Sequence, residues 1–367
     1  MVTITQTKLG PLVATFGGIS HIGSASVNQD AFFIVSVDPD TLVLGVFDGH
    51  GPDVGQLAAH AAKAFFTAAF RDASTLSAFL DHPEQESRRL FHACHRQLFG
   101  RFRTFYENQG VSVREEHHEK GVYLVKRFGR TLPYTCVYGG TTATIAVIHH
   151  NRLIVANVGD STALLARPHN ETSPESNQDE TNLPSHLSIL TGHHAPDSKE
   201  EYERILSANP HSTLQFLYDH STDRDQDPIH STSTTSKLSA RYVKNVRHEW
   251  ATVVSAPPDA KHADSLAFTR SLGDFHLHAH GLSCEPDVTE STIEPGMCLV
   301  VASDGVWDVW QYEQVAAFFT GSSQDVEMAL DSARICEFMR MNHAKAQALF
   351  NGQADNMTAV VCSFHSV

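Results

Sequence analysis

The residues of this chain best suited to chemistry are six aspartates that stand in short motifs with glycine, asparagine or serine. They are Asp30, Asp48, Asp160, Asp304, Asp308 and Asp355. Each one alone is an ordinary turn residue, since Asp-Gly and Gly-Asp are common in turns. If the six converged without cations, their charges would repel one another. Convergence therefore implies hard divalent ions with oxygen ligands, Mg²⁺ or Mn²⁺.

One motif combines a carboxylate, a glycine and an imidazole. An apolar segment at residues 42–47 leads into Asp48-Gly49-His50-Gly51, after which the pattern becomes helical. A carboxylate, a carbonyl on a permissive glycine and an imidazole thus follow one another at the end of a predicted strand. The helix that begins next adds free N–H groups and a partial positive charge, which suit an anion.

Apolar periodicity and turn residues indicate a chain of mixed α and β structure. A hairpin is predicted between residues 31–37 and 42–47, because Asp38-Pro39-Asp40 separates them. Apolar residues at helical spacing predict a helix over about 53–70 and a second helical stretch over about 74–106. Three strands, at 142–148, 153–157 and 162–166, are expected to form an antiparallel meander. A strand at 298–302, helices at about 311–319 and 324–349, and a strand at 358–364 complete the prediction.

Length, charge and cysteine content exclude several classes of protein. The chain has 367 residues, with 27 Lys and Arg against 42 Asp and Glu, which gives a net charge of −15 with neutral histidine. We therefore predict no wide cationic surface and no nucleic-acid partner. No apolar run approaches the length of about 18 residues that a membrane span needs, so no membrane partner is expected. The six cysteines lack regular spacing and indicate free thiols, mostly buried, in a cytoplasmic or nuclear protein.

Two polar segments interrupt the predicted elements. Residues 168–185 and 219–237 are rich in polar side chains and cannot bury enough apolar surface to order themselves. Strand and helix signals resume after each segment without a new start. We therefore predict one domain over residues 1–367, with polar insertions at about 168–187 and 206–262. Segment 219–237 is expected to be mobile and open to proteases.

The chain contains 24 histidines, a number that suggests zinc. Structural zinc sites use Cys and His at defined spacing, which is absent here. The one patterned group is His276, His278 and His280, which in an extended segment would point to one side. We favour a solvated loop, or a weak metal-scavenging segment, over a dedicated metal site.

In their order along the chain, these motifs resemble those of the metal-dependent protein Ser/Thr phosphatases of type 2C. The resemblance runs from about residue 20 to residue 364. The matching segments are VFDGHG at 46–51, GTTA at 140–143, ANVGDS at 156–161, LAFTRSLGD at 266–274, EPDV at 285–288, ASDGVWDV at 302–309 and DNMT at 355–358.

The resemblance implies an α+β fold, a four-layer αββα sandwich of two antiparallel β-sheets flanked by helices. It also implies roles for residues of this chain: Asp48 bridges two Mg²⁺ or Mn²⁺ ions, the Gly49 carbonyl binds one, Asp304 and Asp355 bind the other, and Asp30 belongs to the same centre. Asp160 and Asp308, with Asp304, match the positions of a third, weaker ion. His50 matches the general acid, and Arg270 is a candidate for binding the substrate phosphate.

The implied reaction is hydrolysis of phosphoserine or phosphothreonine by direct attack of a metal-bound hydroxide, without a phospho-enzyme. His50, with a pKa near neutrality, can protonate the leaving oxygen. Phosphoproteins are the implied partners, and the oligomeric state is left open.

The chain departs from the family pattern at three places, and other functions stay open. Gln29 precedes Asp30 where the family often has Glu, and Ala25 stands where it commonly carries a basic residue that holds the phosphate. The segment between Arg204 and Leu266, which corresponds to the flap of the family, is longer than usual.

One alternative, favoured by Ala25, is a catalytically weakened relative that acts as a regulatory or binding module. A second is a dinuclear hydrolase for small phosphate esters.

Overall fold

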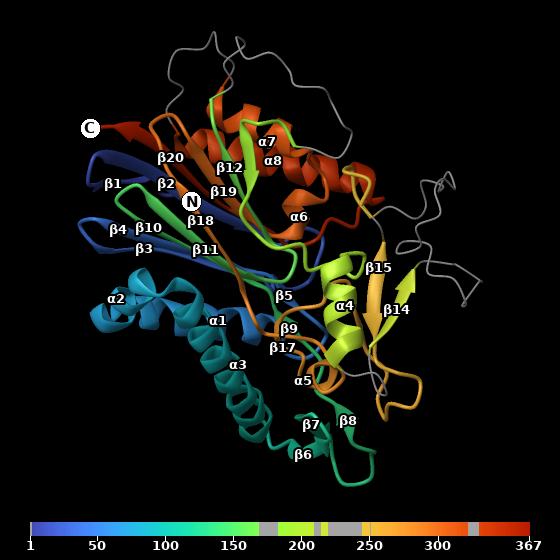
Figure 1. Cartoon of the computed structure of the whole chain (residues 1–367). Helices are drawn as coiled ribbons and strands as arrows, with labels where there is room; N and C mark the ends of the chain where they lie inside the picture. The colour runs from blue at the N-terminus through green and yellow to red at the C-terminus, as the bar shows by residue number, and fades with distance from the viewer. Residues whose placement is uncertain (1, 169–182, 209–213, 219–243, 250, 322–329) are drawn as a thin grey trace.

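Two antiparallel β-sheets lie face to face in the computed structural model, which describes residues 2–168, 183–208, 214–218, 244–249, 251–321 and 330–367 (Figure 1). The six-stranded sheet has the order β1 (Thr5–Leu9), β2 (Leu12–His21), β20 (Met357–Ser366), β19 (Cys298–Ala302), β12 (Thr162–Ala166) and β13 (Leu187–Ile189). The five-stranded sheet has the order β18 (Asp287–Thr292), β11 (Arg152–Val158), β10 (Ala143–His149), β4 (Thr41–Phe47) and β3 (Ala31–Asp38).

Helices cover the outer face of each sheet. The five-stranded sheet packs against α1 (Gly55–Arg71), α2 (Ala73–Asp81) and α3 (Pro83–Asn108), and the six-stranded sheet packs against α7 (Tyr312–Thr320) and α8 (Ser332–Leu349) (Figure 1). This arrangement confirms the predicted four-layer αββα sandwich.

Strand β4 shows why the layers hold their register. Its residues Leu42, Leu44 and Val46 face the core between the two sheets, whereas Val43 and Phe47 face the core beneath α1. Successive side chains of a strand point to opposite faces, so a strand buried on both faces is apolar throughout. A slip of one residue would exchange the two faces, and the position at which the strand ends is therefore fixed.

The β3–β4 hairpin is confirmed, with Asp38 paired to Thr41. The helical stretch predicted at 74–106 is divided into α2 and α3 at His82–Pro83. Proline suits the first turn of a helix but cannot continue one, because it has no N–H to donate. The new helix therefore begins at Pro83.

The predicted meander is wrong in its third strand. Strands β10 and β11 pair as expected, but β12 pairs with β19 and β13 of the other sheet. Both β11 and β12 are almost wholly buried, so the apolar pattern alone does not reveal which sheet each one joins. The crossing carries Gly159-Asp160-Ser161 from one sheet to the other.

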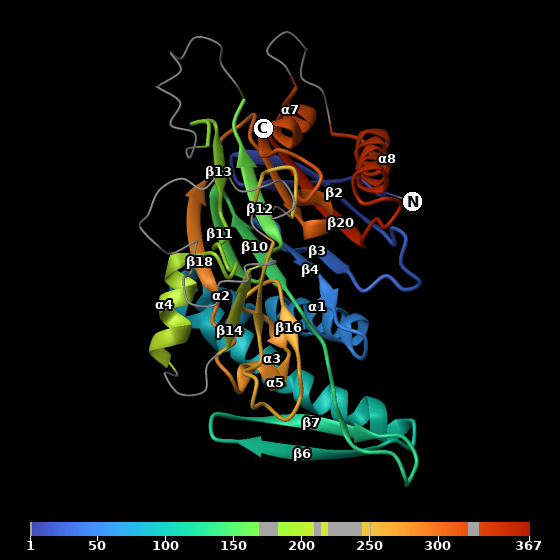
Figure 2. The same cartoon turned by 90° about the vertical axis from the view of Figure 1, so that its right-hand side faces the viewer.

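Three small sheets lie outside the sandwich. They are β17 (Leu272–Gly273), β9 (Gly140–Thr141) and β5 (Gly49–His50); β14 (Gln215–Tyr218), β15 (Thr252–Ser255) and β16 (Ser265–Leu266); and β6 (Ser112–His118), β7 (Gly121–Arg127) and β8 (Thr135–Cys136). The β6–β7 hairpin extends along α3, on the side away from the six-stranded sheet (Figures 1 and 2). The insertion predicted at 206–262 thus contains β14 and β15 and follows α4 (Lys199–Ala208). Segment 219–237, predicted to be mobile, lies outside the described residues.

The solvated loop predicted for His276, His278 and His280 is wrong. A short helix, α5 (Phe275–His278), begins there, and His276 and His280 are only 1% and 3% exposed. The three rings do not share one side: His276 contacts His280 and Tyr123, whereas His278 contacts His95 of α3. A helical turn separates residues that an extended segment would align.

All six cysteines are free thiols, and five of them are buried, as predicted; Cys336 on α8 is exposed. In the part of the chain that the structure describes, no helix has the length and apolar character needed to cross a bilayer. The cytoplasmic or nuclear location stays a prediction.

Candidate metal centre and general acid

The structure brings the six predicted aspartates together. One carboxylate oxygen from each of Asp48, Asp160 and Asp304 lies within 4.8 Å of the others. The charge of Asp30 acts on Asp48, and the charges of Asp308 and Asp355 act on Asp304. All six therefore form one acidic cluster.

The ends of two strand pairs, one from each sheet, supply four of these acids. Asp48 follows β4 and Asp30 precedes β3, and their neighbours Phe47 and Ala31 are paired. In the other sheet, Asp304 opens α6 (Asp304–Trp307) just after β19, and Asp355 lies just before β20. The loop that crosses between the sheets adds Asp160. The sandwich itself thus positions the cluster.

Hydrogen bonds from the neighbouring motifs hold the backbone around Asp48 and Asp160. The Asp48 N–H donates to Thr142 Oγ1 at 3.0 Å, and the Thr142 N–H donates to the Asp48 carbonyl at 2.9 Å. The hydroxyls of Thr142 and Ser161 lie 2.8 Å apart. Thr142 therefore ties the end of β4 to the loop that carries Asp160.

Asp30 is held by residues of the other sheet. Ser303 donates its hydroxyl to Asp30 Oδ2 at 2.9 Å, and the side-chain oxygen of Asn356 accepts from the Gln29 N–H at 2.7 Å. The motifs around Asp304 and Asp355 thus contribute positioning residues as well as acids.

Burial and mutual repulsion raise the pKa values of these carboxyl groups. Burial, followed by the charge of Asp30, raises the pKa of Asp48 well above its usual value. Burial raises the pKa of Asp30 to about 6, and burial with the charge of Asp160 raises the pKa of Asp304 strongly. Each shift shows that burial and the neighbouring acids disfavour the charged form of these carboxyl groups.

The donor set fits hard divalent ions. It consists of carboxylate oxygens, and two of them, Asp30 Oδ1 and Asp160 Oδ1, are buried without a hydrogen-bond partner among the described residues. A bound cation would satisfy these oxygens and remove the repulsion between the acids. The residues present therefore fit Mg²⁺ or Mn²⁺.

Gly49 lies where no side chain fits. A Cβ atom there would be 2.4 Å from the Gly55 carbonyl oxygen and 2.5 Å from that of Gln29. Glycine is thus required for the backbone after Asp48 to pass this close to its neighbours. The predicted role of its carbonyl as a metal ligand stays a proposal.

Lys244 places a positive charge beside the acids. Its Nζ lies 3.8 Å from Asp160 Oδ2 and 4.0 Å from Glu249 Oε2, and the Asn245 side chain donates to Asp308 Oδ1 at 3.0 Å. Burial opposes the charge of Lys244, but the carboxylates of Asp160, Asp308, Asp304 and Glu249 together outweigh it and raise the pKa of the ammonium group. Lys244 was not predicted, because it lies within the polar insertion and no motif marks it.

His50 is bonded to an acid that was not among the predicted site residues. His50 Nε2 lies 2.8 Å from Asp274 Oδ2, which also accepts from Ser271 Oγ at 2.6 Å. The sheet β17-β9-β5 brings these residues together, since both His50 and Gly273 pair with Gly140. A Cβ at Gly140 would lie 2.2 Å from Asp274 Oδ2, so glycine there makes room for the carboxylate. The signal was present in the LAFTRSLGD motif, but its aspartate received no role.

Asp274 favours the charged form of His50. Burial alone would lower the pKa of His50, but the Asp274 carboxylate, with the charge of Asp160 and the backbone of Asp48, outweighs burial and raises it. His50 Nδ1 is buried and has no hydrogen-bond partner among the described residues. A charged imidazole whose second nitrogen is unengaged is suited to donate a proton.

The guanidinium group of Arg270 forms hydrogen bonds with other residues of the protein. Its guanidinium donates to Glu201 Oε1 at 2.6 Å, to Asp287 Oδ1 at 2.7 Å and to the Glu285 carbonyl at 2.9 Å. These bonds use all three guanidinium nitrogens, since Nε also donates to Glu201. Its predicted contact with the substrate phosphate stays a prediction.

Ala25, at the position where the family commonly carries a basic residue, is exposed.

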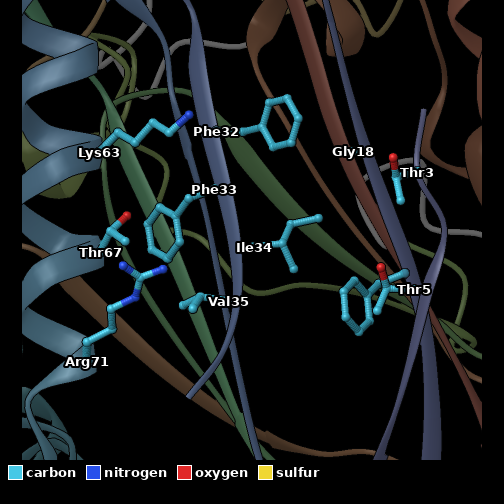
Figure 3. Close-up of a pocket in the computed structure, with 11 residues that line it drawn as sticks. Thr3, Thr5, Gly18, Phe32, Phe33, Ile34, Val35, Lys63, Thr67 and Arg71 are labelled. Carbon is cyan, nitrogen blue, oxygen red and sulfur yellow. The ribbon is translucent and has the colours of Figure 1, made fainter. Parts of the chain in front are cut away.

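Two cavities differ in their fitness for metal chemistry. One of about 330 Å³ is lined by Asp304, Asp308 and Asp355 and opens beside the acidic cluster. A larger one, of about 490 Å³, extends across β3 and is lined by α1 on one side of that strand and by β1 and β2 on the other (Figure 3). Its polar lining is Lys63, Arg71 and hydroxyl groups, with no carboxylate. The smaller cavity is therefore the one that fits a metal-dependent site.

Comparison with known families shows to which family the chain belongs. The model of the family described as Protein phosphatase 2C matches residues 54–214 and 247–351. The chain belongs to the protein phosphatase 2C family. Members of this family are protein serine/threonine phosphatases that depend on metal ions, so the chain is a hydrolase whose substrates are phosphoproteins.

Known members of the protein phosphatase 2C family resemble the chain over most of its length. It is 28% identical to the probable protein phosphatase 2C 48 of Oryza sativa subsp. japonica, over 96% of this chain and 84% of that protein. It is 25% identical to the probable protein phosphatase 2C 65 of Arabidopsis thaliana, over 89% of this chain and 73% of that protein.

Solved structures share the fold. The serine-threonine phosphatase 2C of Toxoplasma gondii matches with a TM-score of 0.58 and 18% identity, over 99% of both chains. A bacterial serine phosphatase matches with a TM-score of 0.52 and 13% identity, over 95% of this chain and 96% of that one.

Proposed function

We propose that this protein phosphatase 2C chain hydrolyses phosphoserine or phosphothreonine at a centre that holds two Mg²⁺ or Mn²⁺ ions and a third, weaker one. The observation that carries the proposal is the convergence of Asp48, Asp160 and Asp304 within 4.8 Å. His50, whose pKa is raised chiefly by Asp274 against the opposing effect of burial, follows Asp48 by two residues. Cation ligands and a proton donor are thus adjacent, as direct hydrolysis of a phosphate ester requires.

The carboxylates would divide between the ions. Asp48 would bridge two ions, the Gly49 carbonyl would bind one, and Asp304 and Asp355 would bind the other. Asp30 would complete this centre, and Asp160 with Asp308 would hold the third ion. Bound there, the ions would lower the pKa of water and neutralise the charge of the phosphoryl oxygens.

His50 and Asp274 would supply the proton. Asp274 holds His50 Nε2 at 2.8 Å, so the ring is fixed in orientation and Nδ1 is the nitrogen left to donate. The leaving Ser or Thr oxygen is a strong base and needs this proton, whereas an aryl leaving group needs it less. Asp274 therefore acts as a positioning residue for the general acid.

The flap would limit which substrates reach the centre. Val254 of β15 and Leu282 pack with Ile205 of α4 and Leu277 of α5 in one apolar cluster, and α5 follows Asp274 directly. We propose a single catalytic domain in which the insertion at 206–262 acts as an enlarged flap beside the general acid. A protein substrate would contact it, and a small ester would not.

A second function is favoured by Ala25. This position is exposed and carries no charge, and the guanidinium of Arg270 is engaged by Glu201 and Asp287. A chain that binds metal but captures phosphate weakly would act as a regulatory or binding module.

The test measures turnover of a phosphothreonine peptide and of an aryl phosphate side by side, while Mg²⁺ or Mn²⁺ is titrated. The proposal expects turnover of both that depends on metal, is abolished by chelation, and is lost in Asp48→Asn. If folded protein binds Mn²⁺ but turns over neither substrate, the regulatory module is correct. Turnover of the aryl phosphate alone would show a hydrolase for small esters.

A further inference from the structure

A second group of metal-ligand side chains lies beside the β17 segment, where the Gly273 N–H donates to His95 Nδ1. His95 of α3, His278 of α5 and Cys284 each offer one ligand atom, and these atoms lie within 4.8 Å of one another. His92 is three residues before His95 and thus on the same face of α3. Its Nδ1 lies 3.4 Å from Cys284 Sγ. We call His92, His95, His278 and Cys284 the His–Cys cluster.

The surroundings of the His–Cys cluster orient its rings. His92 Nε2 lies 2.6 Å from Glu285 Oε1, and His278 Nε2 lies 3.2 Å from the Ser271 carbonyl. A carbonyl oxygen only accepts, so Nε2 of His278 carries the proton and Nδ1 keeps a lone pair. Histidines that bind metals are usually oriented by such a bond from the second ring nitrogen to a carboxylate or carbonyl.

The protonation states suit a metal that binds imidazole and thiolate. Burial lowers the pKa of His95 to about 4 and lowers that of His278 well below its usual value, so both rings are neutral at pH 7. Burial raises the pKa of Cys284 to about 12, so the thiol is protonated until a metal displaces its proton. Sulfur and imidazole ligands select zinc-class ions over Mg²⁺.

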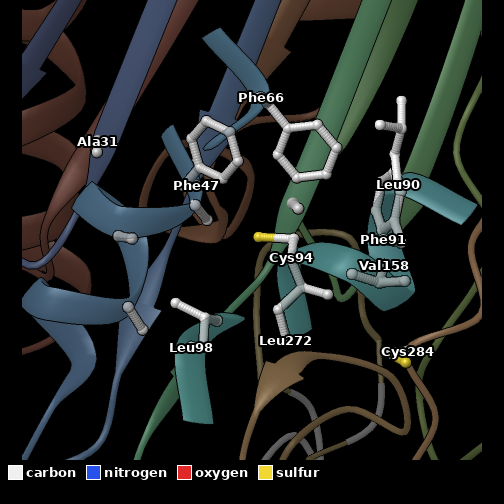
Figure 4. Close-up of a cluster of buried hydrophobic side chains, with 14 of the residues drawn as sticks. Ala31, Phe47, Phe66, Leu90, Phe91, Cys94, Leu98, Val158, Leu272 and Cys284 are labelled. Carbon is white, nitrogen blue, oxygen red and sulfur yellow. The ribbon is translucent and has the colours of Figure 1, made fainter. Parts of the chain in front are cut away.

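We propose that the His–Cys cluster binds one zinc-class ion, separately from the carboxylate centre. Three nitrogens and one sulfur would surround the ion, the bond to Cys284 Sγ forming as the thiol proton is released to solvent. Tetrahedral zinc needs ligand atoms roughly 3.3–3.8 Å apart. The atoms of His95, His278 and Cys284, which lie within 4.8 Å of one another, and His92 Nδ1 would therefore draw together around the ion. The 38% exposed side chain of His92 provides an entry path from the surface, and the cluster borders the apolar core that contains Cys284 (Figure 4).

Metal binding at this cluster would act on the general acid. The Gly273 N–H donates to His95 Nδ1 at 3.2 Å. A metal on Nδ1 would occupy the lone pair that accepts this bond. A metal on Nε2 would leave the ring proton on Nδ1, which then cannot accept either, so the bond is lost in both cases. Gly273 directly precedes Asp274, the residue that holds His50. A zinc-class ion would therefore disturb the backbone that positions the general acid.

The experiment uses Co²⁺ as the probe, added to the full chain in saturating Mg²⁺ so that the carboxylate centre is filled. We expect one Co²⁺ per chain, with tetrahedral visible bands and a thiolate-to-cobalt charge-transfer band. The charge-transfer band should be lost in Cys284→Ser and kept in Asp48→Asn. The matched control is Cys336→Ser, which removes the exposed thiol and should keep the band.

The proposal would be overturned if the wild-type chain showed no charge-transfer band, or if the band survived in Cys284→Ser. Loss of the band in Cys336→Ser would assign it to the exposed thiol instead. A second variant, His278→Gln, guards against misfolding of Cys284→Ser. It should weaken Co²⁺ binding at least tenfold while the thermal transition without Co²⁺ is kept. Undiminished affinity in that variant would also contradict the site. None of these readouts requires phosphatase activity.

Discussion

His50 Nε2 and Asp274 Oδ2 lie 2.8 Å apart although 224 positions separate the two residues in the chain. The contact depends on three two-residue strands, β5, β9 and β17, and on a glycine at 140 that leaves room for the carboxylate. Asp274 itself has a φ of 44°, a left-handed conformation that aspartate tolerates better than most residues. Strained backbone of this kind is retained where function depends on it.

Removal of the Asp274 carboxylate should impair proton donation. In Asp274→Asn, burial of His50 remains while the opposing charge is lost, so the pKa of His50 should fall. We expect kcat for a phosphothreonine peptide to fall by about 100-fold or more, with KM little changed. The alkaline limb of the kcat–pH profile should move to lower pH.

The aryl phosphate provides the comparison for this variant, because its leaving group is less basic and should lose less rate. Asp264→Asn serves as the matched control, because Asp264 lies near His50 without a hydrogen bond to it among the described residues and should therefore shift the profile less. An alkaline limb that does not move in Asp274→Asn would show that Asp274 does not set the pKa of His50.

Asp48→Asn should abolish activity while the protein still folds. The variant loses the proposed bridging ligand, so turnover in saturating Mn²⁺ should fall to background. Without metal it should melt at a higher temperature than the wild-type chain, because one of the mutually repelling acids is gone. Turnover near the wild-type value would refute the metal assignment, and a lower melting temperature in chelator would refute the repulsion.

Stabilisation by metal should depend on pH. Burial raises the pKa of Asp30 from 3.8 to about 6, so between these values the folded chain binds more protons than the unfolded chain. The free energy of unfolding of metal-free protein should therefore fall as pH rises through this window. Bound Mg²⁺ replaces those protons. The increase in melting temperature that Mg²⁺ causes should therefore become larger from pH 4 to pH 7. A difference that is constant across this range would contradict the coupling.

Lys244 should compete with the third cation. In Lys244→Met the charge beside Asp160 is lost, and Mn²⁺ should bind the Asp160–Asp308 position about three- to tenfold more tightly. Calorimetric titration of Mn²⁺ measures this change. Lys199→Met, at a lysine whose side chain is 73% exposed, is the matched control and should leave affinity unaltered. Weaker Mn²⁺ binding in Lys244→Met would show that the lysine supports the site.

Zinc should inhibit turnover through the His–Cys cluster. In saturating Mg²⁺, one equivalent of Zn²⁺ should lower kcat severalfold in the wild-type chain and leave Cys284→Ser unaffected, because the Gly273–His95 bond is then kept. Equal inhibition of both proteins would place the zinc effect at the carboxylate centre. This prediction concerns the coupling to Asp274, whereas the cobalt band tests the site itself.

Local patterns alone determined most of the sandwich strands, though not β1, β13 or β18, and also the β3–β4 hairpin and the acids that follow apolar runs. Alternation, turn chemistry and helical spacing act between residues close in the chain, so a single sequence reveals them. Asp30, Asp48, Asp304 and Asp355 were found because each stands at a strand end whose apolar run is unmistakable. Their convergence was implied by the family resemblance, and pairing of the strands accounts for it.

Tertiary packing decided what local patterns do not encode. The choice of sheet for β12, the contact of His50 with Asp274, the approach of Lys244 to Asp160 and the grouping of His95 with Cys284 all join segments far apart in the chain. Each side chain there has an ordinary alternative, such as a turn for Asp274 or a solvated surface for Lys244. Only the burial of surrounding apolar surface, a property of the whole fold, selects among these alternatives.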